Sequence, residues 1–233
     1  RKSSAPASSP RTPPRLTDPS PHGPGIPAPE NPPAGNPGVY HALTDPLVHE
    51  VRTPMRIFSC PSCGGEVNFS NTDCLACGQP LHFDIAVGDF VSAGADCTNR
   101  PAIGCNWVAG DSGLCWSCAM TRVIPETMEG ENRLHWAKSE TAKRRVLAQL
   151  GRWGWFTPAD TGRLPVFRML SEVTSDGPRD VVMAHGDGEI TINVTEADVL
   201  ERMERREELG EKLRTMIGHI RHEIAHFLFL RLC

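Results

Sequence analysis

Near the end of the chain, residues 217–227 read Ile-Gly-His-Ile-Arg-His-Glu-Ile-Ala-His-Phe. His222, Glu223 and His226 form the pattern His-Glu-x-x-His within a segment whose apolar residues recur at helical spacing. Residues four apart share one face of a helix, so the two imidazoles can bind one metal ion while Glu223 lies beside its open coordination position. Zinc held by three protein groups keeps a water molecule, and a carboxylate can shuttle the proton of that water. The pattern therefore predicts a zinc-dependent hydrolase with Glu223 as the general base.

A chance pattern on a charged helix is the alternative interpretation of these residues. The neighbouring sequence disfavours it, because four apolar residues form a stripe: Ile217, Ile220, Ile224 and Phe227. Each histidine of the pattern lies two positions, or about 200°, from an isoleucine of this stripe. We therefore expect the helix to have one core face and one opposed ligand face.

The third zinc ligand is not evident from the sequence. His219 is seven residues from His226, a rise of about 10.5 Å, which is too far for one tetrahedral ion. His185 is a conceivable ligand. Three acidic residues on the preceding part of the predicted helix lie out of reach: Glu204, Glu207 and Glu208. We expect the ligand downstream, yet the chain stops at Cys233, after an apolar run with nothing visible to cover it.

The chain contains nine cysteines and lacks an export signal, so we expect thiols in a reducing compartment, where they favour metal. Four of them form two CxxC motifs ten residues apart: Cys60, Cys63, Cys74 and Cys77. Each motif can present two thiolates to one zinc ion, and the following glycines, Gly64 and Gly78, permit a tight turn. A redox dithiol or disulfides are the alternatives, and two matched motifs argue against both. The spacing predicts a zinc ribbon over residues 55–82.

A second group of four cysteines lies in the loop-rich segment 83–125: Cys97, Cys105, Cys115 and Cys118. Only the last pair has CxxC spacing. We prefer a second four-cysteine zinc site over the alternative, in which buried cysteines act as small hydrophobic residues. Both cysteine sites are expected to be structural, since four thiolates leave zinc no open position for water.

Residues 1–54 contain 14 of the 21 prolines and little aliphatic periodicity, so they are predicted to be a disordered leader. Met55 directly precedes the first cysteine motif and is our hypothesis for the native initiator. The length and the 39% of hydrophobic residues suffice for one domain with a small satellite. We assign residues 126–233 to that domain, which carries the His-Glu-x-x-His pattern.

Within residues 126–233 the spacing predicts a helix at 132–156 and extended segments at 166–170 and 181–185. Asp187-Gly188 lies between two apolar runs and indicates a β-hairpin with a tight turn. Thr195 is predicted to cap a helix that continues to the end of the chain and loosens at Gly210.

Charge and hydropathy limit the classes of partner. The formal net charge of −4 provides no global basic field, so binding of nucleic acid is not expected. A basic run, Lys143-Arg144-Arg145, with Trp153 and Trp155 could form a nucleic-acid patch, but we interpret it as a solvated helix face with core tryptophans. No run of 18 apolar residues could span a bilayer, and we expect a cytoplasmic protein without membrane contact.

From Met55 to about His226 the chain carries an ordered series of motifs: Phe58-x-Cys60-Pro-x-Cys63-Gly, Cys74-x-x-Cys77-Gly, Cys105-Asn-Trp107, Cys115-x-Ser-Cys118, Asn132-Arg-x-x-Trp136, Ile190-Thr-Ile-Asn193 and Arg214-Thr-x-Ile-Gly-His219-x-Arg-His222-Glu223. In these motifs it resembles a bacterial family of zinc-binding metallopeptidases that join an N-terminal zinc ribbon to an HExxH domain. The resemblance implies a gluzincin-like peptidase with His222 and His226 as ligands, Glu223 as base, and an acidic third ligand beyond the helix. The last six residues depart from the family pattern, which suggests a truncated fragment or a frameshift.

We therefore predict an α+β fold, with a small zinc ribbon followed by a truncated zincin-like domain that has a β-hairpin and a C-terminal active-site helix. The predicted function is hydrolysis of a peptide or protein substrate, with one catalytic-type zinc and two structural zinc ions. The ribbon would stabilise the protein or dock a protein partner. The alternative is a non-catalytic adaptor whose ribbons bind protein or nucleic acid and whose HExxH domain is a remnant.

Overall fold

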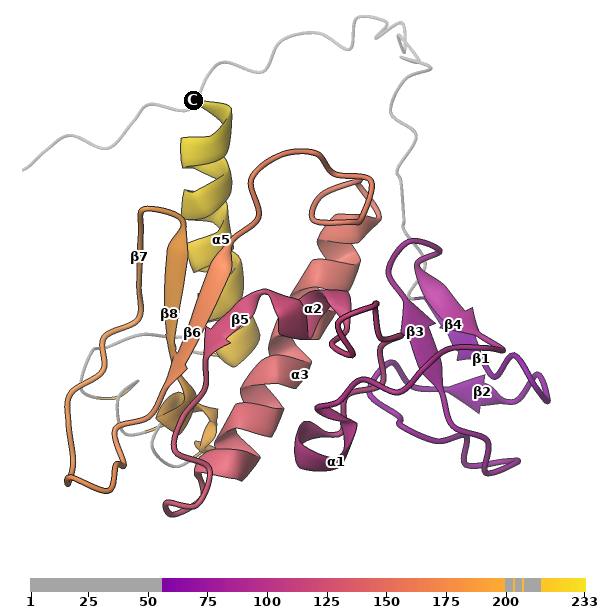
Figure 1. Ribbon diagram of the computed structural model, residues 1–233, viewed down its shortest axis with the longest axis horizontal. Helices are drawn as coiled ribbons and strands as arrows, with labels where there is room; N and C mark the ends of the chain where they lie inside the picture. The colour runs from indigo at the N-terminus through magenta and orange to yellow at the C-terminus, as the bar shows by residue number, and fades with distance from the viewer. Residues whose placement is uncertain (1–55, 200–202, 204–206, 208–214) are drawn as a thin grey trace, which may run out of the picture. The chain divides into compact units, whose positions relative to one another are not determined.

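Short antiparallel strands form the first part of the chain in the computed structural model, which describes residues 56–199, 203, 207 and 215–233 (Figure 1). Strand β1 (Phe58–Ser59) pairs with β2 (Glu66–Val67), and β3 (His82–Asp84) pairs with β4 (Asp89–Val91). Four phenyl rings pack together between these strands: Phe58, Phe69, Phe83 and Phe90. The predicted leader, residues 1–54, lies outside the described residues.

Two short helices connect the strands to the rest of the chain, α1 (Arg100–Ile103) and α2 (Trp116–Ala119). Cys115 caps α2, and its Sγ accepts a hydrogen bond from the backbone N–H of Cys118. The side-chain amide of Asn106, which is 1% exposed, donates to the backbone carbonyls of Phe69 and Asn71. The second cysteine segment is thereby joined to the first by buried polar contacts.

A four-stranded mixed sheet has the order β5-β6-β8-β7. Strands β5 (Thr121–Val123), β6 (Val166–Leu170) and β8 (Glu189–Asn193) are parallel, and β7 (Ala184–Gly186) is an antiparallel edge strand. The predicted extended segment 166–170 is confirmed as β6. The extended segment predicted at residues 181–185 is shorter and begins later, at Ala184, because only Ala184, His185 and Gly186 pair with β8.

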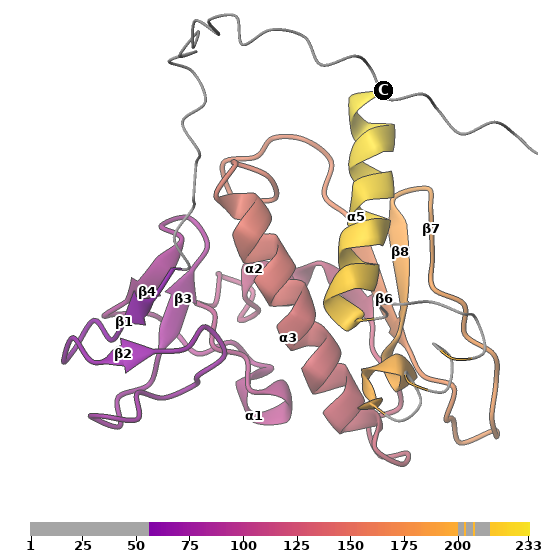
Figure 2. The same cartoon turned by 180° about the vertical axis from the view of Figure 1, so that it is seen from behind.

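Two long helices, α3 (Asn132–Gly151) and α5 (Met216–Leu232), lie on one face of the sheet, as the view from behind shows (Figure 2). Helix α3 begins where the sequence predicts and ends five residues earlier than residue 156. The early end has a backbone cause, since Gly154 (φ 83°) and Phe156 (φ 55°) adopt left-handed conformations that do not continue a helix.

The predicted hairpin is confirmed. Asp187 and Gly188 have φ values of 51° and 83°, the positive pair that a type I′ turn requires, and Gly186 pairs with Glu189 directly beside them. The predicted cap at Thr195 is wrong. The side chain of Asn193 caps the 3-10 helix η1 (Val194–Ala197), accepting from the N–H of Thr195.

The hydroxyl of Thr195 instead accepts a hydrogen bond from the N–H of Glu172. Helix α5 has its own start, because Thr215 accepts from the N–H of Gly218. The predicted loosening at Gly210 lies outside the described residues.

The basic run at residues 143–145 is not a solvated helix face. Lys143 and Arg144 are 0% and 2% exposed, and only Arg145 faces solvent. Lys143 is buried because its Nζ lies 2.9 Å from a carboxylate oxygen of Glu140, which is also buried. Trp153 is 75% exposed and therefore not a core residue.

The fold class is α+β, as predicted, with small antiparallel sheets in the cysteine-rich part and a mixed sheet covered by helices in the rest. The buried core is continuous from the cysteines to α5, and the proposed boundaries at residues 82 and 125 remain predictions. None of the helices in the described part of the chain is long and apolar enough to cross a membrane.

Candidate functional site

Helix α5 has the two faces that the sequence predicts. Ile220 and Ile224 are 0% and 1% exposed and pack into the core with Phe227. His222 lies on the exposed side, and His226 is partly exposed. The apolar stripe therefore holds the helix against the sheet and leaves the histidines accessible to solvent.

The two histidines of the pattern point their nitrogens at each other. His222 Nε2 and His226 Nε2 are 3.0 Å apart, and their rings are inclined by 80°. Two imidazole nitrogens bound at 2.0–2.1 Å to a tetrahedral ion would be separated by about 3.3 Å. The pair is therefore pre-arranged to chelate one zinc ion after a small adjustment.

His185 joins this group from the edge strand β7. Its Nδ1 lies 2.9 Å from Glu223 Oε2, so the imidazole donates a hydrogen bond to the carboxylate. Its ring stacks on that of His226, with centroids 4.1 Å apart and planes inclined by 8°. Because nitrogen lone pairs lie in the ring plane, two parallel stacked rings do not direct them at one point. His185 therefore contacts the candidate base in this arrangement and does not take the place of a third ligand.

Glu223 is 6% exposed although it is a carboxylate. The hydrogen bond from His185 satisfies one of its oxygens and holds the side chain in one orientation. None of the residues that the structure describes donates a hydrogen bond to the other oxygen. The sequence pattern predicts Glu223 as the base, but it suggests His185 only as a metal ligand and gives no sign of this contact.

The remaining candidates for a third ligand do not reach the histidine pair. His219 faces η1, where its Nε2 lies 3.5 Å from Glu196 Oε2. Within the described ranges, no third His, Cys, Asp or Glu places a ligand atom within 4.8 Å of both His222 and His226. Glu204 and Glu208 lie outside these ranges.

The first cysteine group comes together as its spacing predicts: Cys60, Cys63, Cys74 and Cys77 lie with their sulfurs within 4.8 Å of one another. Two of the sulfur separations are 3.8 and 3.7 Å, and four thiolates at 2.3 Å from a tetrahedral zinc ion would be about 3.8 Å apart. Gly64 and Gly78 have φ values of 74° and 72°, and their N–H groups close the turns around the sulfurs. The residues fit a structural zinc ion.

The second cysteine group, Cys97, Cys105, Cys115 and Cys118, also gathers its sulfurs within 4.8 Å. Cys105 Sγ lies 3.5 Å from Cys115 Sγ and 3.9 Å from Cys118 Sγ. All four residues are at most 2% exposed, whereas Cys63 and Cys77 of the first group are exposed. Small hydrophobic residues have no reason to meet sulfur to sulfur, so the geometry favours the zinc interpretation.

The close packing of the four thiols in the second group couples their protonation. Hydrogen bonds from the neighbouring thiols lower the pKa values of Cys97 and Cys105, and the same contacts raise the pKa of Cys115. Four thiolates cannot all carry charge at this distance unless a cation compensates them. A zinc ion supplies this compensation in sites built from four cysteines.

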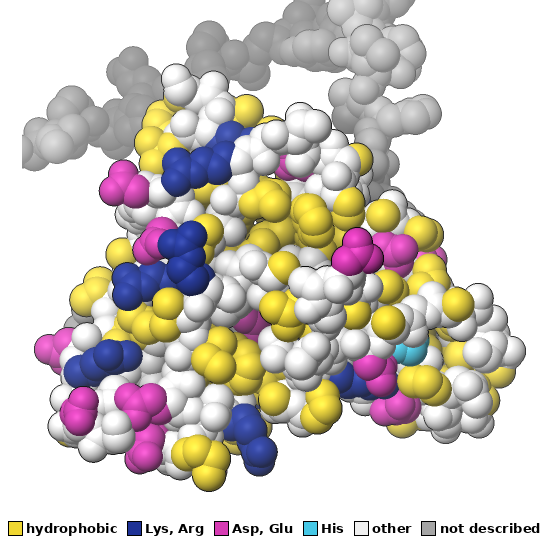
Figure 3. All heavy atoms as spheres, viewed as in Figure 1, with side chains coloured by type: hydrophobic (Ala, Val, Ile, Leu, Met, Phe, Trp, Pro, Cys, Tyr) yellow, Lys and Arg dark blue, Asp and Glu magenta, His cyan; other side chains and the backbone are white. Residues whose placement is uncertain are grey.

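The end of helix α5 is anchored by Arg231. Its guanidinium forms an ion pair with Asp160, and its Nη1 donates to the backbone carbonyl of Arg163 at 3.1 Å. Beyond these contacts the end of the helix is apolar and exposed: Phe229, Leu230 and Leu232. Hydrophobic side chains are visible at the top of the space-filling view, where α5 ends (Figure 3).

Helix α5 presents the His-Glu-x-x-His pattern and packs on a mixed sheet with an antiparallel edge strand. Residues 132–233 match the family described as "Putative zinc-binding metallo-peptidase". The match runs through the last residue. The expectation that the final six residues depart from the family pattern stays a prediction.

Three relatives are 35% identical to the chain over 191 residues, one from Mycobacterium bovis and two from strains of Mycobacterium tuberculosis. All three are described as uncharacterized proteins. The matched region is 76% of this chain and 54% of each relative, so the chain spans about half the length of the curated relatives it matches. No solved structure gives a significant match.

Proposed function

We propose that this chain carries the core of a zinc-dependent peptidase active site, with His222 and His226 as metal ligands and Glu223 as the general base. The observation that carries the proposal is the convergence of four side chains from two elements. The histidine nitrogens of α5 lie 3.0 Å apart, and the adjacent carboxylate is held by His185 of β7. When bound, zinc polarises a scissile carbonyl and lowers the pKa of a water molecule to about 7.

In this mechanism Glu223 accepts a proton from the attacking water and passes it to the leaving amine. Its Oε2 is engaged by His185, which leaves Oε1 for the water. The burial of Glu223 keeps the carboxylate out of bulk solvent, so it has few competing hydrogen-bond partners. His185 fixes the orientation of the base and does not itself touch the reacting atoms.

The edge strand β7 is the proposed site for an extended substrate peptide. It is paired on one side with β8 and packs near helix α5 on the same face as the histidines. Ala184 and Gly186, which flank His185, are exposed and small. Backbone hydrogen bonds to a strand edge can hold a peptide without regard to its sequence. The substrate proposed is therefore a peptide or an extended protein segment.

The third metal ligand is part of the proposal. We expect an acidic side chain contributed from beyond helix α5, because zinc bound by two histidines alone keeps too many open positions for tight binding. Without that residue, occupancy of the histidine site is expected to be weak. The two four-cysteine sites should fill independently of it.

The test combines zinc content with hydrolysis of a mixed peptide pool. With all three sites filled, the protein should contain about three zinc ions per chain, and Glu223→Gln should keep the zinc while losing about 100- to 10,000-fold in rate. Glu131→Gln, which changes an exposed glutamate at the start of α3, is the matched control and should behave as wild type. Undiminished hydrolysis by Glu223→Gln would show that this carboxylate is not the base.

The second candidate is a non-catalytic zinc-ribbon adaptor. One observation favours it: both cysteine groups have four ligand atoms in place, whereas the histidine pair has two within the described residues. An adaptor should contain two zinc ions per chain and hydrolyse no peptide in the same assay. It should also keep its zinc content in a His222→Ala, His226→Ala variant.

A further inference from the structure

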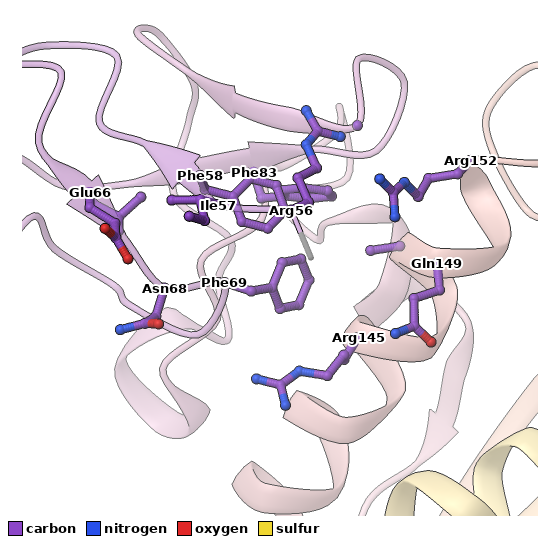
Figure 4. Close-up of a pocket in the computed structure, with 13 residues that line it drawn as sticks. Arg56, Ile57, Phe58, Glu66, Asn68, Phe69, Phe83, Arg145, Gln149 and Arg152 are labelled. Carbon is purple, nitrogen blue, oxygen red and sulfur yellow. The ribbon is translucent and has the colours of Figure 1, made fainter. Parts of the chain in front are cut away.

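A cavity of about 550 Å³ lies between residues 56–88, here called the first cysteine module, and helix α3, far along the chain from the His-Glu-x-x-His pattern (Figure 4). The module supplies Phe58 and Phe69 to its wall, and α3 supplies Arg145, Gln149 and Arg152. This volume is within the range of about 300–1,000 Å³ that is usual for ligand sites. None of these residues belongs to the proposed peptidase centre.

The cavity has an excess of positive charge. Arg56, Arg145 and Arg152 line it, and Glu66 is the acidic residue among its lining residues. Arg56 forms an ion pair with Asp89. Neither Arg145 nor Arg152 has an ion pair or a side-chain hydrogen bond to any residue that the structure describes, and both are exposed. Figure 4 shows both side chains extending from α3 toward the module. Two guanidinium groups are therefore available to an anionic ligand.

The remaining wall of the cavity is apolar. Phe58, Phe69 and Phe83 contact one another with ring centroids 5.0–6.0 Å apart, and Val67 and Ala148 lie beside them. The rings pack mainly edge to face or tilted against each other, with interplanar angles of 44–82°. Such a cluster provides an apolar surface against which a side chain can pack. It does not offer the free parallel faces on which successive bases stack.

We propose that this cavity binds a short acidic peptide segment in extended conformation, with an apolar side chain seated on the phenyl cluster and carboxylates on Arg145 and Arg152. These arginines are seven positions apart on α3, so they share one face at a rise of about 10.5 Å. A polyproline II segment places residues i and i+3 on one face about 9.3 Å apart. Guanidinium groups bind carboxylates through paired hydrogen bonds. The spacing and chemistry thus match two acidic residues with an apolar residue between them.

A nucleic-acid strand fits the same cavity less well. Its affinity depends on neutralising many phosphates, whereas this cavity offers two unpaired cations on a chain of net charge −4. An acidic peptide needs only the local contacts. The proposal is independent of the peptidase function, since neither Arg145 nor Arg152 touches the histidine pair.

Fluorescence anisotropy on the zinc-loaded protein tests the proposal. The probe is a labelled seven-residue peptide with two glutamates three positions apart, and with leucine and proline between them. We expect saturable binding that weakens by at least about tenfold in the Arg145→Gln, Arg152→Gln double variant, which corresponds to about 1.4 kcal/mol. The matched control is Arg133→Gln, an exposed arginine on the same helix that does not line the cavity, and it should bind within about twofold of wild type.

Two further probes, a neutral peptide and a single-stranded oligonucleotide, serve as comparisons. The same peptide with glutamine in place of both glutamates should bind at least about tenfold more weakly. Absence of saturable binding by the acidic peptide, equal binding by the neutral peptide, or an undiminished affinity in the double variant would overturn the proposal. Tighter binding of a single-stranded oligonucleotide than of the acidic peptide would overturn it in favour of a nucleic-acid site. Thermal unfolding of each variant checks that the exposed substitutions leave the fold intact.

Discussion

His185 Nδ1 donates a hydrogen bond to Glu223 Oε2 across 2.9 Å, although 38 positions separate the two residues in the chain. The contact joins the edge strand of the sheet to the helix that carries the histidine pair. It places an imidazole against the carboxylate that we propose as base, and the same ring stacks on His226. The edge strand therefore supplies a side chain as well as a backbone edge to the candidate site.

Replacing His185 tests this positioning role. His185→Ala removes the donor that holds Glu223, so we expect kcat for peptide hydrolysis to fall by about 10- to 100-fold, with little change in KM. The zinc content should stay the same, because His185 is not a ligand in this arrangement. His185→Asn, which keeps a donor, should recover part of the rate.

The zinc content of His185→Ala distinguishes two roles of His185, that of a positioning residue and that of a third zinc ligand. Loss of one zinc ion per chain in His185→Ala would mean that this residue is the third ligand and that our assignment as a positioning residue is wrong. An unchanged rate in the same variant would mean that the hydrogen bond to Glu223 does not matter for catalysis.

A further prediction concerns the zinc content of a variant that lacks the histidine pair. In a form that binds three zinc ions, the double variant His222→Ala, His226→Ala should lose one ion and keep the two bound by the cysteine groups, because the sites share no residue. His219→Gln is the control on the same helix, since His219 faces Glu196, and it should keep all three. Elemental analysis of the purified proteins measures the difference. Equal zinc in the double variant and wild type would exclude the pair as ligands.

The two cysteine groups should differ in how easily they release metal. The first group has two exposed cysteines, Cys63 and Cys77, whereas all members of the second group are buried. A chromogenic chelator should therefore remove zinc in two phases, the first from the exposed site under native conditions and the second only as the protein unfolds. Cys63→Ser should abolish the fast phase and leave helical circular dichroism largely intact.

Cys105→Ser is the contrasting variant. Cys105 is 0% exposed and contacts the sulfurs of both Cys115 and Cys118, so its loss should prevent zinc binding at the buried site and unfold the core around it. Structural zinc sites contribute about 10–16 kcal/mol of apparent binding free energy in small zinc domains, so the effect should exceed that of a typical core mutation. A stable, fully folded Cys105→Ser protein would show that the second group is not a zinc site.

The buried pair of Lys143 and Glu140 gives a prediction about stability. Lys143 Nζ also donates to the carbonyl of Ser117 at 3.0 Å, within the last CxxC turn, so the pair connects α3 to that turn. Lys143→Met leaves Glu140 buried without its cation and should lower the free energy of unfolding by about 3–5 kcal/mol. The double variant Lys143→Met, Glu140→Leu should recover much of the loss. Lys138→Met, at an exposed position of the same helix, should have little effect in denaturant titrations.

Local patterns in the sequence predict the parts of this fold that depend on neighbouring residues. The CxxC turns, the hairpin at Asp187-Gly188, strand β6 and the ligand face of α5 all follow from spacing and turn chemistry, because their geometry is set within a few residues. The convergence of Cys97 and Cys105 on the last CxxC turn depends on loops that carry no such signal. It could be proposed only from the number of cysteines.

Tertiary contacts account for what the sequence could not predict. His185 meets Glu223 only because β7 pairs with β8 and packs on α5, and neither relation is encoded in the residues around His185. Lys143 is buried because the carboxylate of Glu140 and the backbone carbonyl of Ser117 accept its hydrogen bonds. The charged residues of the sequence alone do not reveal these contacts. Thr195 has the residue type of a helix cap, but Asn193 occupies the capping position in the fold.

The ion pair of Asp160 with Arg231 makes stability depend on pH at the acidic end of the range. Hydrogen bonds from the Arg231 guanidinium, helped by the N–H groups of Phe156 and Gly162, hold the pKa of Asp160 well below its usual value near 3.9. Because the folded-state pKa is lower than the unfolded one, the pair stabilises the fold fully above about pH 4, and this contribution is lost as the pH falls further. Asp160→Asn should therefore lower Tm by a few degrees at pH 7, and the difference from wild type should shrink below about pH 4. Asp111→Asn, at an exposed position, should shift neither value. A difference between Asp160→Asn and wild type that stays constant down to about pH 2 would mean that the charge of Asp160 does not contribute to stability.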